Sequence, residues 1–309
     1  MGNILDLFLR ANSLREKHHK NKVSLCAIVN AKSGLCAQDC KFCSQSLYHK
    51  TNIRRYPLLS AEEILKYAKQ ASRIHATCFG IVTSGKSTDS AKELDTICRA
   101  LKLIKKNLPR LKRSASLGML GSSELLALKK AGLERYHHNL ETSERFFPKI
   151  CTTHTHDKRL ATIRSAKALG LEVCSGGIFG MGETVNDRVS LAKTLKRFDV
   201  DSIPLNFLNP IKGTTLANKK PMPPLEILKT IALFRINLPK ADIKVCGGRN
   251  MNLRMLQSMI FFAGANGMMI GNYLTTAGND PRLDLQMIKD LGLKIRNADG
   301  RRLHADYRR

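Results

Sequence analysis

Three cysteines that lie within eight residues of one another are the part of this sequence best suited to chemistry. They are Cys36, Cys40 and Cys43, spaced C-x3-C-x2-C, with Phe42 directly before the third. Thiolates this close along the chain can converge on one soft metal centre, and sulfur ligands favour zinc or an iron–sulfur cluster. Structural zinc takes four protein ligands, whereas a four-iron cubane held by three cysteines keeps one iron open for a small molecule. The spacing therefore favours a 4Fe-4S cluster over a zinc site or three unconnected thiols.

Two further segments place small or polar residues directly after apolar runs. The segment 174–184 has the form G-x-I-x-G-x-x-E, and its glycines let the backbone approach a ligand closely. The segment 136–143 carries Asn139 and Glu141, which alternate onto one face of a strand as the period of two requires. Together with the cysteines, these segments predict a site for a small ligand. The residues that define the first form are Gly176, Ile178, Gly180 and Glu183.

Short apolar runs alternate with amphipathic segments along the chain, which predicts eight strands and eight helices. The expected strands are 23–30, 77–83, 112–117, 133–140, 171–176, 201–206, 241–247 and 266–270. The expected helices are 60–75, 88–105, 121–131, 157–169, 187–198, 223–237, 250–262 and 281–291.

Eight units of this kind predict an α/β fold, a (β/α)8 TIM-type barrel, whose usual length is ~250 residues. An open doubly wound sheet is the alternative. We expect an N-terminal helical arm over 1–22, the barrel over 23–293 and a C-terminal tail over 294–309. Chemistry in such barrels lies at the carboxyl ends of the strands, and the three cysteines directly follow the first expected strand.

Composition limits the cellular setting and the partners. No apolar run approaches 18 residues and no secretion signal is apparent, so we expect a cytoplasmic protein without a membrane partner. In that compartment nine cysteines are metal ligands or buried thiols rather than disulfides. The net charge of +27 is spread over nearly every expected helix, Trp is absent, and aromatic residues form only 6% of the chain. We therefore expect solvated helix faces and no nucleic-acid partner.

The cysteine segment resembles the radical S-adenosylmethionine (SAM) enzymes, and the chain from about residue 23 to 293 is similar to their biotin synthase family. The similarity depends on many motifs that occur in the same order. These are NAKSG (30–34), YHHNLETS (136–143), VCSGG (173–177), SIPLN (202–206), GGR (247–249) and YLTT (273–276).

This resemblance implies a reaction and its cofactors. A 4Fe-4S cluster on Cys36, Cys40 and Cys43 would cleave SAM to a 5′-deoxyadenosyl radical, which takes hydrogen from dethiobiotin, and a second iron–sulfur cluster would supply the sulfur of biotin. A flavodoxin or ferredoxin as electron donor and a homodimer are also implied. The implied SAM contacts are Phe42 with Gly176, Ile178, Gly180 and Glu183 for the adenine, and Asn139 with Glu141 for the ribose. The implied substrate contacts are Asn206 for the ureido ring, Thr275 with Thr276 for the carboxylate, and His137.

The second cluster is where this chain departs from the family pattern. The familiar cluster is 2Fe-2S, held by three cysteines and an arginine, of which Cys78, Cys174 and Arg249 match three ligands. Ser114 stands where the remaining cysteine is expected, while Cys26 and Cys246 are additional. We expect Cys26, Cys78, Cys174 and Cys246 to hold a larger cluster, with four irons favoured over two, and the catalytic Arg249 to be its counter-charge or outer ligand. The alternative is that Cys26 and Cys246 only fill core positions.

Some residues and functions stay open. His154 and His156 alternate as metal ligands can, but they also fit a loop or helix cap; Cys98 and Cys151 fit ordinary thiols. His137 stands where the family usually has Asn. Another radical SAM enzyme on the same barrel, of the hydrogenase-maturation or methylornithine type, is the nearest alternative function. A basic zinc- or nucleic-acid-binding protein is the alternative from a different class.

Overall fold

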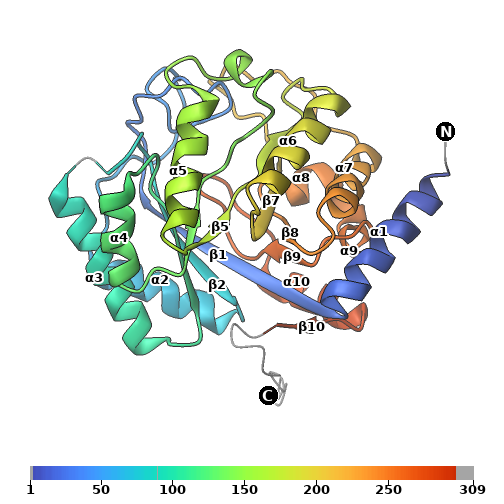
Figure 1. Cartoon of the computed structure of the whole chain (residues 1–309), viewed down its shortest axis with the longest axis horizontal. Helices are drawn as coiled ribbons and strands as arrows, with labels where there is room; N and C mark the ends of the chain where they lie inside the picture. The colour runs from blue at the N-terminus through green and yellow to red at the C-terminus, as the bar shows by residue number, and fades with distance from the viewer. Residues whose placement is uncertain (1–2, 89, 297–309) are drawn as a thin grey trace.

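Eight parallel strands close into a barrel, and helices surround it (Figure 1). The structure is a computed structural model and describes residues 3–88 and 90–296. The last strand pairs with the first, from Ser24 opposite Gly267 to Cys26 opposite Met269, so the sheet has no open edge there. The (β/α)8 expectation is confirmed and the open sheet is wrong. The barrel strands are β1 (Lys22–Lys32), β2 (Cys78–Thr83), β3 (Lys112–Ser116), β4 (Arg135–His137), β5 (Glu172–Cys174), β7 (Ser202–Phe207), β8 (Asp242–Val245) and β9 (Gly267–Met269).

The helices that follow these strands lie close to their expected ranges. They are α2 (Ala61–Arg73), α3 (Ala91–Asn107), α4 (Ser122–Lys130), α5 (His156–Ala168), α6 (Val185–Arg197), α7 (Pro224–Asn237) and α10 (Pro281–Asp290). A capping box begins α2, because the Ser60 hydroxyl accepts from the Glu63 amide and the Glu63 carboxylate accepts from the Ser60 amide. This local pairing fixes where the long cysteine-bearing loop after β1 ends.

Three expected elements differ in the structure. The strand expected over 133–140 is only β4 (Arg135–His137), so Asn139 and Glu141 follow the strand instead of alternating on its face. The helix expected over 250–262 is broken into α8 (Arg249–Leu253), a 3-10 turn η2 (Arg254–Leu256) and α9 (Met259–Phe262). The break follows from Arg254, whose φ of +52° is left-handed and ends α8. The strand expected over 171–176 is shortened to β5, and an additional strand, β6 (Gly177–Phe179), follows it and pairs with β7.

The first and last described elements lie on the outside of the barrel (Figure 1). Helix α1 (Ile4–His19) falls in the expected arm and packs against α7 and α9, while β10 (Lys294–Ile295) pairs with Lys22 and Val23 at the start of β1. The rest of the expected tail lies outside the described residues, and the domain boundaries stay predictions. Within the described ranges, no helix has both the length and the apolar character needed to cross a bilayer.

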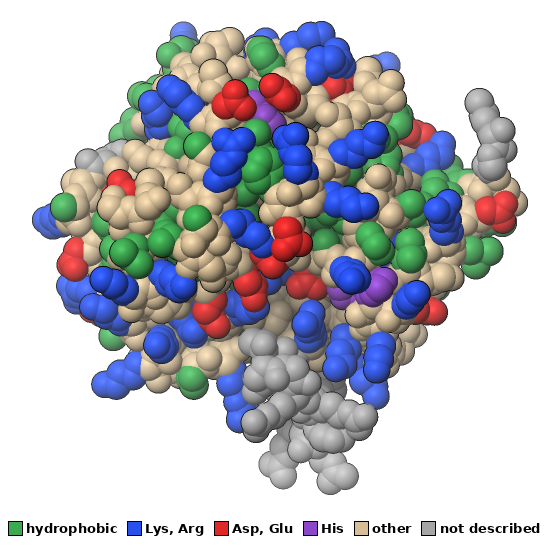
Figure 2. All heavy atoms as spheres, in the orientation of Figure 1, with side chains coloured by type: hydrophobic (Ala, Val, Ile, Leu, Met, Phe, Trp, Pro, Cys, Tyr) green, Lys and Arg blue, Asp and Glu red, His purple; other side chains and the backbone are tan. Residues whose placement is uncertain are grey.

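Lysine and arginine side chains cover much of the face in Figure 2 and are interspersed with a smaller number of carboxylates. They are spread over several helices on this face. This distribution fits the expectation of solvated helix faces better than that of one basic groove.

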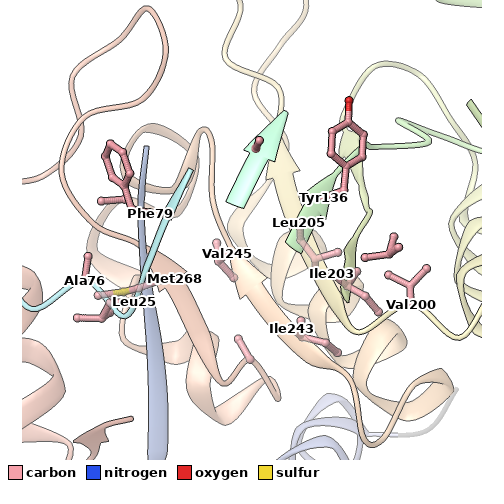
Figure 3. Close-up of a cluster of buried hydrophobic side chains, with 14 of the residues drawn as sticks. Leu25, Ala76, Phe79, Tyr136, Val200, Ile203, Leu205, Ile243, Val245 and Met268 are labelled. Atoms are coloured by element: carbon pink, nitrogen blue, oxygen red, sulfur yellow. The ribbon is translucent and has the colours of Figure 1, made fainter. Parts of the chain in front are cut away.

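Side chains packed between the barrel wall and the helices form the main core (Figure 3). Leu25 and Phe79 are almost fully buried on β1 and β2, and Ile203 and Val245 are buried on β7 and β8. Parallel strands covered by helices need apolar side chains on their outer face. Period-two alternation then turns the intervening side chains toward the barrel interior, where the polar and sulfur-bearing residues lie.

Candidate active site

A cavity of about 350 Å³ lies inside the barrel, between the loops at the carboxyl ends of the strands and the thiols on the strands. Most of the residues expected to bind ligands line it. These are Phe42, Cys43, Cys26, Cys78, His137, Asn139, Glu141, Cys174, Ile178, Asn206, Cys246, Thr275 and Thr276. The remaining expected residues lie outside its lining: Cys36, Cys40, Gly176, Gly180, Glu183 and Arg249.

The three-cysteine loop is held in a compact turn at the mouth of this cavity. The Cys43 amide donates to the Cys40 carbonyl (2.9 Å), and the Cys36 amide donates to the Gln45 carbonyl (3.0 Å). Burial raises the pKa of Cys43 to about 11, and the neighbouring Cys36 contributes to the rise. Ligation to a metal deprotonates a thiol. A compact set of three sulfurs is a suitable donor set for a 4Fe-4S cluster.

Cys151 and His154 lie beside Cys40, which the local spacing does not reveal. The Cys40 and Cys151 sulfurs are 3.7 Å apart, and the Cys151 sulfur is 3.3 Å from His154 Nδ1. Ligand atoms of these three residues lie within 4.8 Å of one another. Asp39 joins the two segments, because its carboxylate accepts from the Thr152 amide (2.9 Å). The alternation of His154 and His156 left metal binding by both open, but among the described residues His156 is not part of this group.

Asn139 and Glu141 reach the cavity from the end of β4. The Asn139 Nδ2 donates to the Glu141 carboxylate (3.4 Å), and the Asn139 Oδ1 accepts from the Gly176 amide (3.1 Å). Glu141 has a φ of +69°, which a non-glycine residue adopts only when its surroundings hold it there. Burial raises the pKa of this carboxyl above its ordinary value. The backbone strain and the buried carboxylate are typical of a binding site.

The glycine-rich segment shapes the loop, and only Ile178 of its four expected residues lines the cavity. A Cβ on Gly176 would lie 2.0 Å from the Pro204 carbonyl oxygen, so β5 and β7 could not approach as they do. The Glu183 carboxylate accepts from the amides of Gly180 (3.0 Å) and Met181 (2.9 Å). Glu183 therefore stabilises the turn in which Gly180 has its left-handed φ of +90°.

The residues expected to bind the substrate come from three strand ends. The Asn206 Oδ1 accepts from the Gly247 amide (2.9 Å), which fixes the side chain at the cavity wall. Thr275 lies 3.1 Å from the Ser44 hydroxyl across the cavity mouth. His137 Nδ1 is 3.3 Å from the Cys174 sulfur, so this side chain contacts a thiol as well as the cavity.

Four thiols line the cavity along its strands. Cys26 and Cys78 lie opposite each other in the β1–β2 register, and Cys174 and Cys246 complete the set from β5 and the end of β8. Burial raises the pKa of Cys246 well above its ordinary value, and Cys26 and Cys174 raise it further. Soft, buried sulfur donors gathered in this way fit an iron–sulfur cluster.

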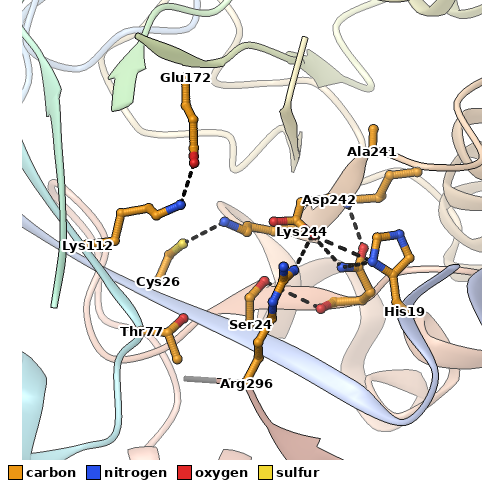
Figure 4. Close-up of polar contacts among 12 residues, drawn as sticks. His19, Ser24, Cys26, Thr77, Lys112, Glu172, Ala241, Asp242, Lys244 and Arg296 are labelled. Atoms are coloured by element: carbon orange, nitrogen blue, oxygen red, sulfur yellow. Dashed lines mark hydrogen bonds and ion pairs between the residues drawn. The ribbon is translucent and has the colours of Figure 1, made fainter. Parts of the chain in front are cut away.

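Two buried cations beside these thiols were missed by sequence reasoning. Lys244 is 2% exposed, and its Nζ donates to the Cys26 sulfur (3.1 Å; Figure 4). Arg135 is 4% exposed and donates to the Glu172 carboxylate (2.6 Å). The sequence could have indicated both cations, because each lies two residues before a site residue and therefore points to the same face of its strand. Those site residues are His137 for Arg135 and Cys246 for Lys244.

Ser114 and Arg249 differ in their positions relative to the thiols. Ser114 lines the cavity on β3, as its alignment with an absent cysteine predicts. Arg249 is 1% exposed, and its Nη2 donates to the Asp284 carboxylate (2.6 Å) while its Nη1 donates to Gln257 Oε1 (2.7 Å). The structure thus gives this guanidinium protein partners outside the cavity lining.

Comparison with known proteins is consistent with this geometry. Residues 32–195 match the model of the Radical SAM superfamily, and residues 204–294 match that of the Biotin and Thiamin Synthesis associated domain. Biotin synthase from Geobacter sulfurreducens is 53% identical over 294 residues, which cover 95% of this chain and 89% of that protein. Biotin synthase from Endomicrobium trichonymphae is 51% identical and covers 94% and 89%, respectively.

Solved structures show the same fold at low sequence identity. Methylornithine synthase has a TM-score of 0.83 at 20% identity, covering 96% of this chain and 90% of its own. The FeFe-hydrogenase maturase HydG from Carboxydothermus hydrogenoformans has a TM-score of 0.79 at 19% identity, covering 96% and 74%. These two show the barrel alone, whereas identity above half over nearly the whole chain identifies the family. The cysteine loop, the barrel and this identity agree: the chain belongs to the biotin synthase family of radical SAM enzymes.

Proposed function

We propose that this enzyme converts dethiobiotin to biotin with sulfur from an auxiliary four-iron cluster held by Cys26, Cys78, Cys174 and Cys246. The observation that supports the proposal is that four thiols, from β1, β2, β5 and the end of β8, line the same cavity. Lys244 and Arg135 lie next to them and can balance the negative charge of a thiolate-ligated cluster. Both cations are buried, so water screens this charge only weakly.

The first cluster would be held by Cys36, Cys40 and Cys43. When bound, it supplies the electron that cleaves SAM. Phe42 and Ile178 would hold the adenine between them, and Asn139 and Glu141 would bind the ribose hydroxyls. Phe42, Ile178 and the two polar residues line the same cavity, which supports this arrangement.

Dethiobiotin would bind between the two cluster sites. Asn206 would contact its ureido ring, and Thr275 and Thr276 would contact its carboxylate. His137 would contact the ureido group or the cluster, because it lies beside Cys174. Arg249 remains a proposed outer ligand or counter-charge, although its bonds to Asp284 and Gln257 make Lys244 the better placed cation.

The remaining partners follow from the family. We propose a flavodoxin or ferredoxin as the electron donor, a homodimer as the assembly and the cytoplasm as the compartment. Nine cysteines are compatible with a reducing compartment.

The test is the iron and acid-labile sulfide content of anaerobically purified protein, together with its electron paramagnetic resonance spectrum. Two four-iron clusters give about eight iron atoms per chain. Cys26→Ser and Cys246→Ser should each lower the iron content and stop biotin formation, while 5′-deoxyadenosine formation continues. Cys98→Ser, on the outer helix α3, is the matched control and should change neither. Full iron content in Cys246→Ser, or a single cluster in the unchanged protein, would refute the four-thiol site.

A further inference from the structure

A second cavity of about 500 Å³ lies at the opposite end of the barrel, among the amino ends of the strands. Ser24 and Thr77 line it at the start of β1 and β2, and Lys112 lines it at the start of β3 (Figure 4). The reaction described above uses only the cavity at the carboxyl ends. This basal cavity is therefore without an assigned role.

The two cavities share three lining residues, Cys78, Arg135 and Lys244. These residues form the partition between the cavities. Cys78 and Lys244 are also next to Cys26, because Lys244 bonds to the Cys26 sulfur and Cys26 faces Cys78 in the strand register. The basal cavity thus reaches the proposed auxiliary-cluster site from the side opposite the substrate.

The basal cavity has a positive lining. Seven lysine or arginine residues line it against three carboxylates. Each carboxylate already has a cation close by: Glu172 lies 2.6 Å from Lys112, Asp242 lies 3.4 Å from Arg296, and Asp201 lies 3.3 Å from Lys167. The rim includes the exposed Lys22 and Lys240. A cavity with this charge concentrates small anions and repels cations.

We propose that the basal cavity binds a small sulfur anion, hydrosulfide, and admits it to the auxiliary-cluster site. The inference rests on the proposed function, because that cluster loses a sulfide each time biotin forms. Replacement through the cavity at the carboxyl ends of the strands, the upper cavity, would require SAM and substrate to leave it. Entry through the basal cavity avoids this requirement, since Cys78, Arg135 and Lys244 line both cavities.

The first test uses the cluster-free full-length protein and two alkylating probes, anionic iodoacetate and neutral iodoacetamide. For each cysteine, mass spectrometry gives the ratio of carboxymethylation to carbamidomethylation, in which thiol reactivity largely cancels. Lys22→Glu/Lys240→Glu should lower the ratio at Cys78 roughly threefold or more at low ionic strength, and salt should remove the difference. The ratios at Cys174 and Cys246, which line only the upper cavity, should stay unchanged.

Lys66→Glu/Lys69→Glu is the matched control, because it makes the same charge change on the exposed face of α2. It should leave the ratio at Cys78 unaltered. An unchanged ratio at Cys78 in Lys22→Glu/Lys240→Glu would overturn the proposal, as would an equal change at Cys174 and Cys246.

The second test follows isotopically labelled sodium sulfide into acid-labile sulfide after one turnover. Lys22→Glu/Lys240→Glu should take up label several-fold more slowly, while the biotin formed in the first turnover stays unchanged. Equal uptake rates would refute the basal route. If the unchanged protein forms biotin but takes up no label, free hydrosulfide does not refill the cluster and the proposal is refuted. If it forms no biotin, the proposed function fails instead, and the alkylation ratios still decide whether the cavity admits anions.

Discussion

Cys40 differs from its two partners in the metal loop because another thiol lies within 3.7 Å of it. The hydrogen bond between them favours a proton on Cys40, so the pKa of Cys40 is raised; the same bond, with His154, lowers the pKa of Cys151 to about 5. A cluster that binds Cys40 must displace this proton. Cys151 remains close by without being one of the three predicted ligands.

We predict different outcomes for these neighbouring thiols. Replacing Cys36, Cys40 or Cys43 by Ala should abolish 5′-deoxyadenosine formation, because three thiolates are the minimum that anchors a cubane with an open iron. Cys151→Ser should retain the cluster and at least about a third of the cleavage rate. Chromatographic measurement of 5′-deoxyadenosine decides between these outcomes. Loss of the cluster in Cys151→Ser would make that residue a ligand, and near-normal cleavage in Cys40→Ala would refute the loop assignment.

At the residue scale, spacing predicted the loop cysteines, and the resemblance supplied most of the remaining cavity residues. Neither identified Cys151, because 111 residues separate it from Cys40 and only the fold brings them together. Lys244 was missed for a different reason. A lysine within an apolar strand is normally predicted to be exposed. Its burial becomes apparent only when its strand face is compared with that of Cys246, two residues later.

At the level of elements, the contact between β5 and β7 depends on a residue without a side chain. Gly176→Ala would place a Cβ 2.0 Å from the backbone oxygen of Pro204, and backbone cannot move aside as a side chain can. We expect a loss of about 1–3 kcal/mol in the free energy of unfolding, the usual cost of overpacking. Chemical denaturation of the cluster-free protein measures it.

The control for this substitution is Gly121→Ala at the start of α4. There the nearest atom is the carboxylate end of Glu124 at 3.1 Å, which can rotate away. Because Gly121 is the N-cap and Ala caps a helix less well, the change should cost at most about 1 kcal/mol. Equal effects at the two positions would show that close packing at Gly176 is not what the barrel requires.

A neutral histidine, His19, links helix α1 to helix α7. Arg235 Nη1 donates to His19 Nε2 (3.1 Å), and a guanidinium only donates, so this nitrogen carries no proton. Burial and then Arg235 lower the pKa of His19 to about 4, although Asp242 opposes the shift. Below its ordinary pKa the unfolded chain binds a proton that the folded chain does not.

Stability should therefore fall as the pH drops from about 6.5 to about 4. After solvent screening, His19 should account for roughly 2 kcal/mol of this fall. His19→Gln keeps an acceptor for Arg235 but does not titrate, so its stability should vary less over this window. Denaturation of both proteins at several pH values measures the difference, and parallel curves would contradict the assignment.

The expected strands and helices agree with the structure because hydrophobic periodicity survives in each unit. The break at Arg254 was not predicted, since no glycine or proline marks it and a left-handed arginine depends on tertiary contacts. The additional strand β6 after the fifth barrel strand was also missed. It reflects the approach of Gly176 to β7, which is a long-range constraint.

For the whole molecule, the net charge of +27 is the feature that the reaction does not use. The cations in Figure 2 are spread over the surface in view and alternate with carboxylates. We therefore expect biotin formation without nucleic acid, and dissociation constants for oligonucleotides weaker than about 1 µM near physiological salt. Fluorescence anisotropy with unrelated sequences at several salt concentrations measures this. Tight, sequence-dependent binding would revive a nucleic-acid role.

The closing seam of the barrel has a consequence for how the protein is made. Ser24 on β1 bonds to the backbone of Asn266, 242 positions later in the chain. At about 5–20 residues per second, a ribosome takes about 10–50 s to synthesise the intervening chain. During that time β1 lacks β9, the strand that pairs with it at the closing seam. Cys246 is synthesised only late in the same interval. The auxiliary site can therefore be completed only near the end of translation.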